Sequence, residues 1–284
     1  MTIFSEIEKN EKRLIERGYS VENKYQVCVG ESAYLLKISP MSHLSRKLLE
    51  MKYKSYVPNV PVNAAMLVDF LIEGDEIHSL YPWIEGEDLQ AIMQNLNASE
   101  QYQYGLQAGV WLKQLHTIPI DEEVFDWEET FNQKIDKKIE AHEKVKAYYP
   151  NGEMFMAFIN QHRTLLKNRP LALCHGDFHV GNMMVETHSR QLVVIDFGSI
   201  EIGDPMEEFN RLIWNLLASK TFSSGVIEGY FEGREPTTDE WNLIKLYMAV
   251  DVLSSISWAV NYGNNQIEVM TQRGDFILDW FYRG

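Results

Sequence analysis

The chain has 284 residues, of which 45% are hydrophobic and 24% charged, as in an ordinary globular protein with one large or two modest cores. Its formal net charge is −15, with 41 acidic residues against 26 basic ones, which disfavours nucleic acid as a substrate because phosphate binding needs a basic patch. The start of the chain lacks an apolar signal segment and the apolar stretch 247–260 is short for a bilayer, so we expect a cytoplasmic protein without a membrane partner.

The first elements form a small β-rich region. A charged amphipathic pattern predicts a helix over residues 6–18 that ends at Gly18. Two β-rich runs, 25–29 and 33–38, flank a short polar turn at 30–32 and predict a hairpin. Lys37 lies near the end of the second run among apolar residues.

A helix is predicted over residues 44–56, with Glu50 as its only acid, and two prolines follow it. The next hairpin carries Glu73 and Glu76 near its turn, where we expect them to face solvent. The strand 77–80 then leads into Tyr81-Pro82-Trp83-Ile84-Glu85-Gly86. The rest of the chain is predicted to be mostly helical, with helices over 99–116, within 127–167, and over 239–261 and 266–281.

The most informative window reads His-Gly-Asp-Phe-His-Val-Gly-Asn over residues 175–182 and Ile-Asp-Phe-Gly over 195–198. A kinase catalytic loop, H-R-D-x-x-x-x-N, is followed by D-F-G in the same way. Asp177 and Asn182 have the required spacing, and Asp196 opens the second motif. Gly176 replaces the arginine. A turn and a hairpin tip would explain each motif separately, but their order and spacing favour the catalytic interpretation.

Phosphoryl transfer explains these residue types. A carboxylate beside the acceptor hydroxyl takes its proton, and Asp177 is the candidate. Mg²⁺ prefers hard oxygen ligands, which Asn182 and Asp196 would supply. Apolar runs before His175 and Asp196 predict buried strands that deliver both segments.

Together the two motifs resemble the aminoglycoside phosphotransferase and choline kinase superfamily, the small-molecule branch of the protein-kinase-like fold. Glycine at position 176 is typical of that branch. Five residues separate Gly198 from Asp204-Pro205, which leaves no room for an activation loop, so no protein substrate is expected. The resemblance implies an α+β bilobal fold with a β-rich N-lobe (1–80), a hinge (81–86) and a mostly helical C-lobe (87–284).

The resemblance also implies roles for residues of the nucleotide site. Lys37 would grip the nucleotide phosphates and Glu50 would orient it, although spacing alone leaves Glu73 and Glu76 open. The carbonyl of Pro82 and the N–H of Ile84 would recognise the base. The phosphate-covering turn would lie near residues 20–24, with Ser20 and Asn23 as donors, although this chain lacks a G-x-G-x-x-G there.

In the C-lobe, the resemblance implies that His175 and Asp204 are structural braces and that Asp204 braces the catalytic loop. Asp204 and Pro205 also read as the start of a helix. Glu208, Asp251 and Trp258 are candidate contacts of the acceptor, with core packing as the alternative for the aromatic residue.

We therefore predict a Mg²⁺-dependent kinase that uses ATP or GTP to phosphorylate a hydroxyl of a small molecule. The acidic composition suits a cationic, aminoglycoside-like acceptor, but solubility explains it equally well. Choline or ethanolamine, a ketosugar amine, a macrolide and methylthioribose stay open as acceptors, as does a role in antibiotic resistance. The alternative from another class is a nucleotide-binding pseudoenzyme.

Overall fold

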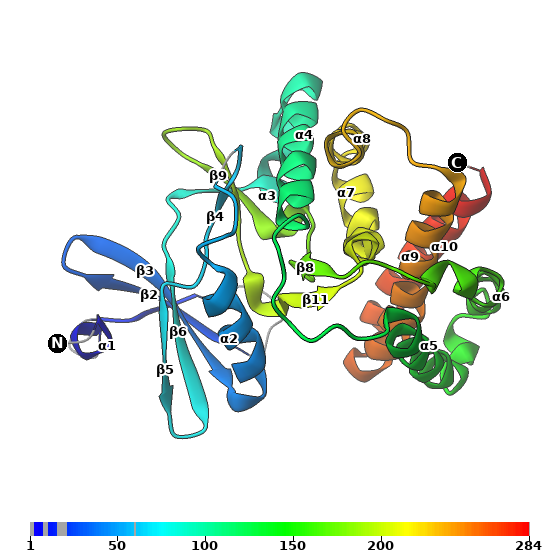
Figure 1. Ribbon diagram of the computed structural model, residues 1–284, viewed down its shortest axis with the longest axis horizontal. Coiled ribbons are helices and arrows are strands. Elements are labelled where there is room, and N and C mark those ends of the chain that lie inside the picture. The colour runs from blue at the N-terminus through cyan, green and yellow to red at the C-terminus, as the bar shows by residue number, and fades with distance from the viewer. Residues whose placement is uncertain (1–2, 8–10, 16–21, 60, 284) are drawn as a thin grey trace.

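The computed structural model describes residues 3–7, 11–15, 22–59 and 61–283. A β-rich region that holds the N-terminal part of the chain lies beside a larger helical region, and two small sheets lie between them (Figure 1). The predicted α+β, kinase-like fold class is confirmed.

The N-terminal sheet has five strands in the order β1-β2-β3-β6-β5, all antiparallel. The strands are β1 (Arg13–Leu14), β2 (Asn23–Val29), β3 (Ser32–Pro40), β5 (Asp69–Glu73) and β6 (Glu76–Pro82). One helix, α2 (Leu44–Tyr53), follows β3 as predicted. The prediction of one helix over residues 6–18 is wrong, because α1 spans only Ile3–Ile7 and β1 extends the sheet by pairing with β2. Sheet pairing here overrides a weak helical pattern.

A second sheet has the order β4-β10-β9-β7, and a third consists of β11 and β8. Their bounds are β4 (Asn63–Ala64), β7 (Gly86–Asp88), β8 (Ala172–Cys174), β9 (Met183–Glu186), β10 (Leu192–Val194) and β11 (Glu201–Gly203). Residues 83–85 connect β6 to β7. Because β4 pairs in parallel with β10, the chain enters the second sheet before it forms β5 and β6, the last two strands of the N-terminal sheet.

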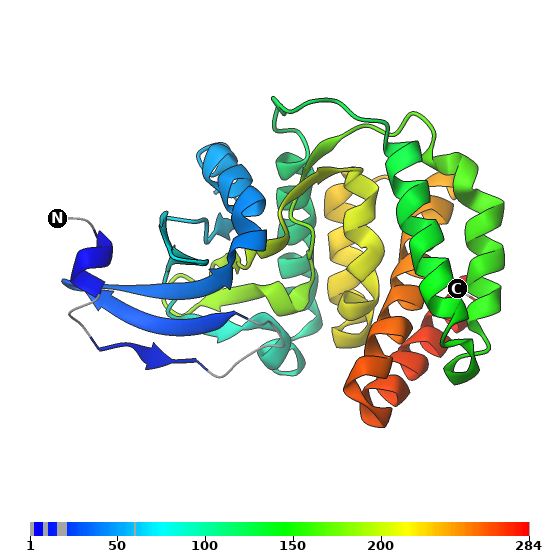
Figure 2. The ribbon, with the colours of Figure 1, turned by 90° about the horizontal axis from the view of Figure 1, so that it is seen from below.

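The helical region holds α3 (Leu89–Ile92), α4 (Ala98–Leu115), α5 (Trp127–Glu143), α6 (Gly152–His162), α7 (Leu212–Ala218), α8 (Lys220–Tyr230), α9 (Thr238–Ala259) and α10 (Asn264–Arg283). Short 3-10 helices cover Met41–His43, Met93–Asn95, Lys146–Tyr148, Arg163–Leu166, Val180–Asn182, Phe197–Ser199, Pro205–Arg211 and Val260–Tyr262. The helices form a layered bundle beside the small sheets (Figure 2). Asn97 and Thr237 begin α4 and α9 with capping boxes, which satisfy backbone N–H groups at both helix starts.

The helices α4 and α8 pack through glycines. Gly105 and Gly109 of α4 face α8, and Gly225 and Gly229 of α8 face α4. A Cβ atom on Gly109 would lie 2.1 Å from the carbonyl oxygen of Val226. The two backbones are therefore in direct contact, and no larger side chain fits without separating the helices.

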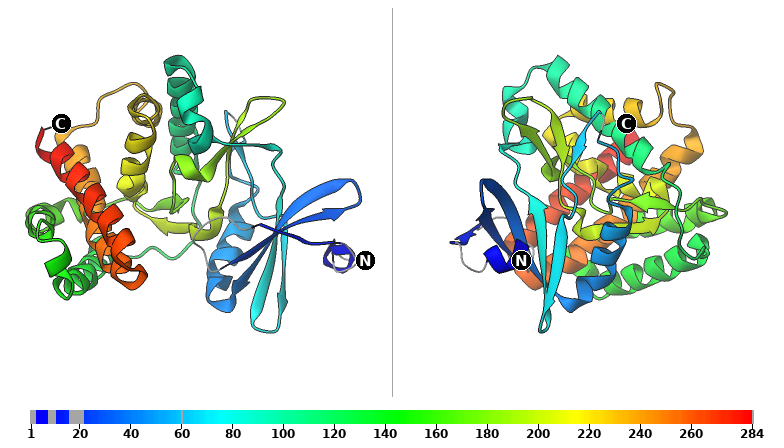
Figure 3. Two further views of the ribbon diagram at one scale, coloured as in Figure 1. Left: turned by 180° about the vertical axis from the view of Figure 1, so that it is seen from behind. Right: turned by 60° about the vertical axis from the view of Figure 1, so that its left-hand side comes forward.

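The most apolar helical stretch, Thr238–Tyr262, is long and apolar enough to be a candidate membrane span by length and composition. This stretch is longer than the apolar segment 247–260 that the sequence analysis considered short for a bilayer. Within the molecule 61% of its most apolar window is buried. It lies beside α10 and contacts α5 and α6, as views from behind and from the side show (Figure 3), so burial in the core accounts for its composition.

Candidate active site

The predicted catalytic loop, residues 175–182, begins where β8 ends, at Cys174. Gly176 has a φ of +80°, and a Cβ atom there would lie 2.1 Å from the carbonyl oxygen of Ser199. Only glycine combines this left-handed conformation with so close an approach of two backbones. Glycine in place of the arginine of protein kinases is therefore required by the way the loop packs on the segment that follows Asp-Phe-Gly.

Glu208 holds the start of this loop. Its carboxylate accepts hydrogen bonds from the backbone N–H of His175 at 3.1 Å and of Gly176 at 2.6 Å. The side chain is buried, and burial raises the pKa of Glu208 to about 8 against the opposing effect of these two donors. The expectation that Glu208 faces the acceptor is therefore wrong, because the Glu208 side chain is buried against the backbone of the loop and supports it.

Asp204 does not brace the loop directly. It accepts from Arg169 at 2.7 and 3.1 Å, from the Tyr247 hydroxyl at 2.6 Å and from the N–H of Met206 at 2.9 Å. It caps the 3-10 helix Pro205–Arg211 and joins it to α9. The bracing role expected of Asp204 thus belongs to Glu208, four residues later.

His175 is fully buried and connects the two catalytic segments. Its Nε2 lies 3.0 Å from the carbonyl oxygen of Ile195, so this nitrogen carries the proton. The Asp177 N–H points at Nδ1 from 3.3 Å. Burial lowers the pKa of His175, which keeps the ring neutral and its tautomer fixed.

The proposed base, Asp177, has both carboxylate oxygens engaged. Oδ2 accepts from Nδ2 of Asn182 at 2.9 Å, and Oδ1 accepts from Nε of Arg211 at 3.0 Å. His179 lies 3.6 Å from Oδ2. Burial opposes ionisation, but His179 and Arg211 outweigh it and hold the pKa of Asp177 well below its usual range.

Arg211 also donates from Nη1 to Asp251 at 2.7 Å, so one guanidinium joins the catalytic loop to α9. The sequence analysis missed this arginine. It follows Asp204-Pro205 by several residues, and no spacing rule connects it to Asp177.

Asp196 is the second residue after the end of β10 and has a left-handed conformation with a φ of +66°. Its Oδ1 accepts from Nζ of Lys37 at 2.7 Å. Although burial opposes it, Lys37 lowers the pKa of Asp196 to about 2. In turn, burial would lower the pKa of Lys37, but Asp196 and Glu22 raise it. Both groups are therefore charged at neutral pH.

Lys24 lies directly opposite Lys37 in the β2–β3 ladder, so both side chains leave the same face of the sheet. Its pKa is lowered by burial and by Lys37. The hairpin turn at Gly30 fixes this register. The position of the turn in the sequence therefore indicates the pairing of Lys24 with Lys37, which was not among the sequence predictions.

The predicted pair of Lys37 and Glu50 is not formed in this structure. The carboxylates within 4.0 Å of the Lys37 ammonium, among the described residues, are those of Asp196 and Glu22. Glu50 is buried and accepts from the Tyr81 hydroxyl at 2.9 Å and from the Leu67 N–H at 2.9 Å. Lys47, a buried lysine one turn before Glu50 on α2, donates to the Tyr81 hydroxyl at 2.6 Å. Lys47 therefore lies beside Glu50, in the position that was predicted for Lys37.

The predicted metal ligands flank two adjacent strands, since Asn182 precedes β9 and Asp196 follows β10. Met183 pairs with Val194, and the Ile195 N–H donates to the Asn182 carbonyl at 3.0 Å, which brings Asn182 and Asp196 to the same edge. The Asn182 amide nitrogen faces Asp177, so its oxygen is turned away from that carboxylate. The described residues contain no cluster of three His, Cys, Asp or Glu side chains for a metal. Two oxygen ligands nevertheless suit Mg²⁺, which keeps waters and binds substrate phosphates.

The predicted base-binding segment lies at the end of β6. The Trp83 N–H donates to the Ala33 carbonyl at 3.2 Å. Because antiparallel strands alternate their hydrogen-bonding sides, the carbonyl of Pro82 points away from β3. Asn23 begins β2 and is exposed, whereas Ser20 lies outside the described residues.

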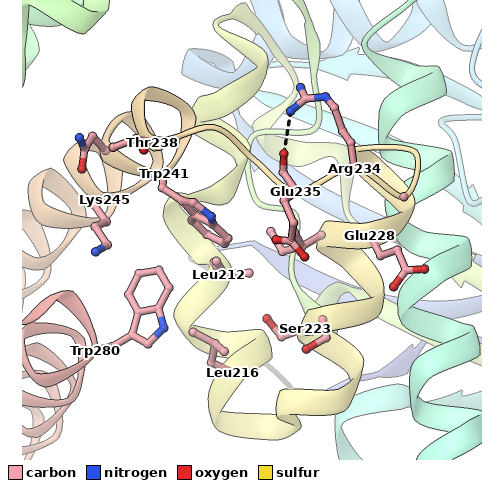
Figure 4. Close-up of a pocket in the computed structure, with 14 residues that line it drawn as sticks. Leu212, Leu216, Ser223, Glu228, Arg234, Glu235, Thr238, Trp241, Lys245 and Trp280 are labelled. Carbon is pink, nitrogen blue, oxygen red and sulfur yellow. Dashed lines mark hydrogen bonds between the residues drawn. The ribbon is translucent and has the colours of Figure 1, made fainter. Parts of the chain in front are cut away.

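Two cavities share Asp251 and Ser254 as wall residues, and one of the two cavities reaches Asp177. One of about 500 Å³ is lined by Asp177, Asp251 and Trp258, and its neighbour of about 230 Å³ by Gly176 and Asp251. Arg211 lines both. The structure thus brings Asp251 and Trp258, two of the predicted acceptor contacts, to the wall beside Asp177. A separate cavity of about 690 Å³ contains Trp241 and Trp280 (Figure 4), and none of the predicted site residues lines it.

A bilobal fold in which a catalytic loop and an Asp-Phe-Gly segment meet beneath a strand lysine defines a phosphotransferase of the kinase-like class. The model of the phosphotransferase enzyme family matches residues 13–244. The chain therefore belongs to this family, and the predictions of its superfamily and of a small-molecule kinase are confirmed.

Solved structures share the fold at low sequence identity. A thermostable mutant of aminoglycoside phosphotransferase APH(4)-Ia, in complex with AMP-PNP and hygromycin B, has a TM-score of 0.70 and 16% identity, with 96% of this chain and 95% of that chain covered. APH(2″)-IIa, in complex with streptomycin and ATP, has a TM-score of 0.65 and 19% identity, with 97% and 93% covered. The search of curated proteins found no match.

Proposed function

We propose that this protein transfers the terminal phosphate of ATP or GTP to a hydroxyl of a small molecule, with Mg²⁺. The observation that supports this most strongly is the junction of Asp177, Asn182 and the Lys37–Asp196 pair at the ends of adjacent strands. These groups supply a carboxylate base, oxygen ligands and a phosphate-binding cation within one site.

Asp177 accepts the proton of the acceptor hydroxyl while the oxygen of that hydroxyl forms a bond to the γ-phosphorus. At the same time, the bond between the γ-phosphorus and the oxygen that bridges it to the β-phosphate breaks. The nucleoside diphosphate leaves with that electron pair. The hydrogen bonds from Asn182 and Arg211 fix the carboxylate in one orientation. A metal bound by Asn182 and Asp196 would neutralise the charge of the phosphates.

The nucleotide end of the site rests on the N-terminal sheet. Lys37 and Lys24, which are paired across β2 and β3, would bind the phosphates together with Asn23 at the start of β2. Ser20, the other predicted donor, lies outside the described residues. Pro82 and Ile84 would hold the base at residues 81–86, which we propose as the hinge between an N-lobe of residues 1–80 and a C-lobe of 87–284.

The acceptor is the open part of this proposal. Two structural neighbours bind hygromycin B and streptomycin, which fits the aminoglycoside-like acceptor expected from net charge. Every acceptor considered above presents a hydroxyl that Asp177 would serve, and a role in antibiotic resistance depends on which one is used. We propose a cytoplasmic location, in keeping with these soluble substrates.

The alternative, a nucleotide-binding protein without turnover, draws on one observation: both oxygens of Asp177 are already hydrogen-bonded and its pKa is depressed, which weakens it as a base. Consumption of Mg·ATP and Mg·GTP should be measured with panels of amino sugars, amino alcohols, sugars and hydroxy acids. We expect acceptor-dependent turnover that falls at least a thousandfold in Asp177→Asn, while nucleotide binding persists. Binding of nucleotide without turnover of any acceptor would support the alternative.

A further inference from the structure

The charge of the cavity wall beside Asp177 differs from that of the whole protein. Five cationic side chains line the two cavities that share Arg211 and Asp251, against four carboxylates, in a chain whose net charge is −15. The cations are Arg46, Lys134, Lys138, Arg211 and Arg273, and the carboxylates are Asp177, Glu201, Glu207 and Asp251. The acidic composition therefore lies elsewhere on the molecule and says little about the acceptor.

Most of these carboxylates already have cationic partners. Arg211 binds both Asp177 and Asp251, and Lys134 lies 2.5 Å from Glu207. Burial raises the pKa of Glu207 to about 7, so part of its charge is absent at neutral pH. A polycationic acceptor could reach these carboxylates only by breaking their existing ion pairs. The free energy lost on breaking a buried pair exceeds the free energy gained from a new contact at the exposed edge of the cavity.

Cationic donors, in contrast, are available. Lys138 is half-buried in the wall, and no carboxylate among the described residues lies within 4.0 Å of its ammonium. Arg211 uses Nε and Nη1 for Asp177 and Asp251, while its Nη2 has no hydrogen-bond partner in the described part of the chain. A guanidinium presents its five N–H donors in one plane, a geometry that matches a carboxylate or phosphate.

From this arrangement we infer that the acceptor carries an anionic group, a carboxylate or a phosphate ester, which Arg211 and Lys138 bind while its hydroxyl lies against Asp177. This inference rests on the proposed function and replaces the cationic acceptor expected from net charge with an anionic hydroxy compound. The anionic group of the acceptor would accept a hydrogen bond from Nη2 of Arg211, and the hydrogen bond from Arg211 to Asp177 would stay in place.

The test uses acceptors that share a skeleton and differ in charge. Turnover with Mg·ATP and Mg·GTP is measured for glucose, glucuronate and glucosamine, and for glycerol, glycerate and 3-amino-1,2-propanediol. Glycerol phosphate separates a phosphate ester from a carboxylate. We expect kcat/KM at least tenfold higher for an anionic member than for its amine, because a hydrogen bond between charged groups is stronger than one between neutral groups. A preference for amines, or equal use of all three, overturns the inference.

Binding of the same compounds to protein loaded with Mg·ADP, followed by calorimetry, separates this inference from the proposed function. Preferential binding of anionic members without turnover of any compound supports the inference and contradicts the proposed function. Turnover confined to amines supports the function and overturns the inference. No preferential binding or turnover of an anionic member also overturns it.

The lysine provides a matched pair of variants on α5. In Lys138→Ala we expect the KM of the anionic acceptor to rise tenfold to a hundredfold, with the nucleotide KM unchanged and with recovery in Lys138→Arg. Lys137→Ala removes an exposed cation one residue away and should leave both constants as in the wild type. A rise in the nucleotide KM instead would assign Lys138 to the phosphates and contradict the inference.

Discussion

The guanidinium of Arg211 donates from Nε to Oδ1 of Asp177 at 3.0 Å, so an arginine holds the proposed base of a phosphotransferase. The same side chain bonds to Asp251 on α9 at 2.7 Å. Two carboxylates near one another repel, and the shared guanidinium offsets that repulsion. The pairing fixes the orientation of Asp177 and weakens it as a base.

Replacing this arginine should therefore change the pH profile. In Arg211→Gln the pKa of Asp177 rises, because a cation that favours its ionised form is lost. A base must be deprotonated to act, so the acidic limb of kcat/KM should move to higher pH in the variant. The profile of kcat/KM from pH 3 to 8 measures this shift, because the low pKa of Asp177 places the acidic limb of the wild type below the usual range of a carboxyl group.

Arg211→Lys is the control, because it keeps a positive charge and loses the planar arrangement of donors. Its acidic limb should stay closer to that of the wild type, although its kcat falls. Coinciding limbs in the wild type and Arg211→Gln would show that Arg211 does not set the protonation of the base.

A further prediction concerns the brace of the catalytic loop. In Glu208→Gln the amide nitrogen cannot accept a hydrogen bond, so one of the two backbone donors of the loop loses its partner. We expect a loss of about 1–3 kcal/mol in the free energy of unfolding and a fall in kcat, with little change in the nucleotide KM. Urea denaturation and steady-state kinetics measure both, and Glu153→Gln, an exposed position, should change neither.

Stability should also depend on pH through the buried carboxyls. Burial raises the pKa of Glu207 to about 7 and of Glu208 to about 8, from an ordinary value of 4.5. The folded state thus binds more protons than the unfolded state between about pH 4.5 and 8, and stability falls as pH rises through this window. The free energy of unfolding at pH 5, 6, 7 and 8 should decline less steeply in Glu208→Gln than in the wild type. Equal slopes would contradict a raised pKa at Glu208.

Local patterns in the sequence predicted much of this fold and brought the main candidates to one place. Asp177, Asn182 and Asp196 follow or precede short apolar strands, and strand ends that pair must meet. The hairpin likewise delivers Lys37 to Asp196. These relationships depend on short stretches of chain.

The errors involve contacts that local patterns do not determine. Glu207, Glu208 and Asp204 are close in sequence, and the 3-10 path of residues 205–211 decides which of them turns under the loop. The pairing of Glu50 depends on Tyr81 and Lys47, which reach it from a strand and from the preceding helical turn. If the acceptor is anionic, as we infer, net charge is a poor guide to it, because net charge averages over the whole surface and the acceptor contacts only the cavity wall.

Lys24 should contribute to nucleotide binding, since it lies opposite Lys37 and interacts electrostatically with Asp196. In Lys24→Ala we expect the KM of the nucleotide to rise about tenfold while the acceptor KM stays unchanged, because a charge-assisted contact to phosphate is lost. Lys24→Arg should restore most of the binding. Lys167→Ala, an exposed lysine remote from the nucleotide, serves as the control, and an equal effect there would point to net charge alone.

The contact between α4 and α8 makes a prediction about stability alone. In an exposed helix, replacing glycine by alanine stabilises by up to about 1 kcal/mol through backbone entropy. At Gly109 the new Cβ atom would lie 2.1 Å from the Val226 carbonyl oxygen and 2.7 Å from the Tyr230 nitrogen, both backbone atoms that cannot rotate away. The helices must separate, so we expect Gly109→Ala to lower the free energy of unfolding by at least about 2 kcal/mol. Gln103→Ala, on the exposed face of α4, should stay within about 0.5 kcal/mol of the wild type in the same urea titration. A stabilised Gly109→Ala would mean that α4 and α8 are not in backbone contact.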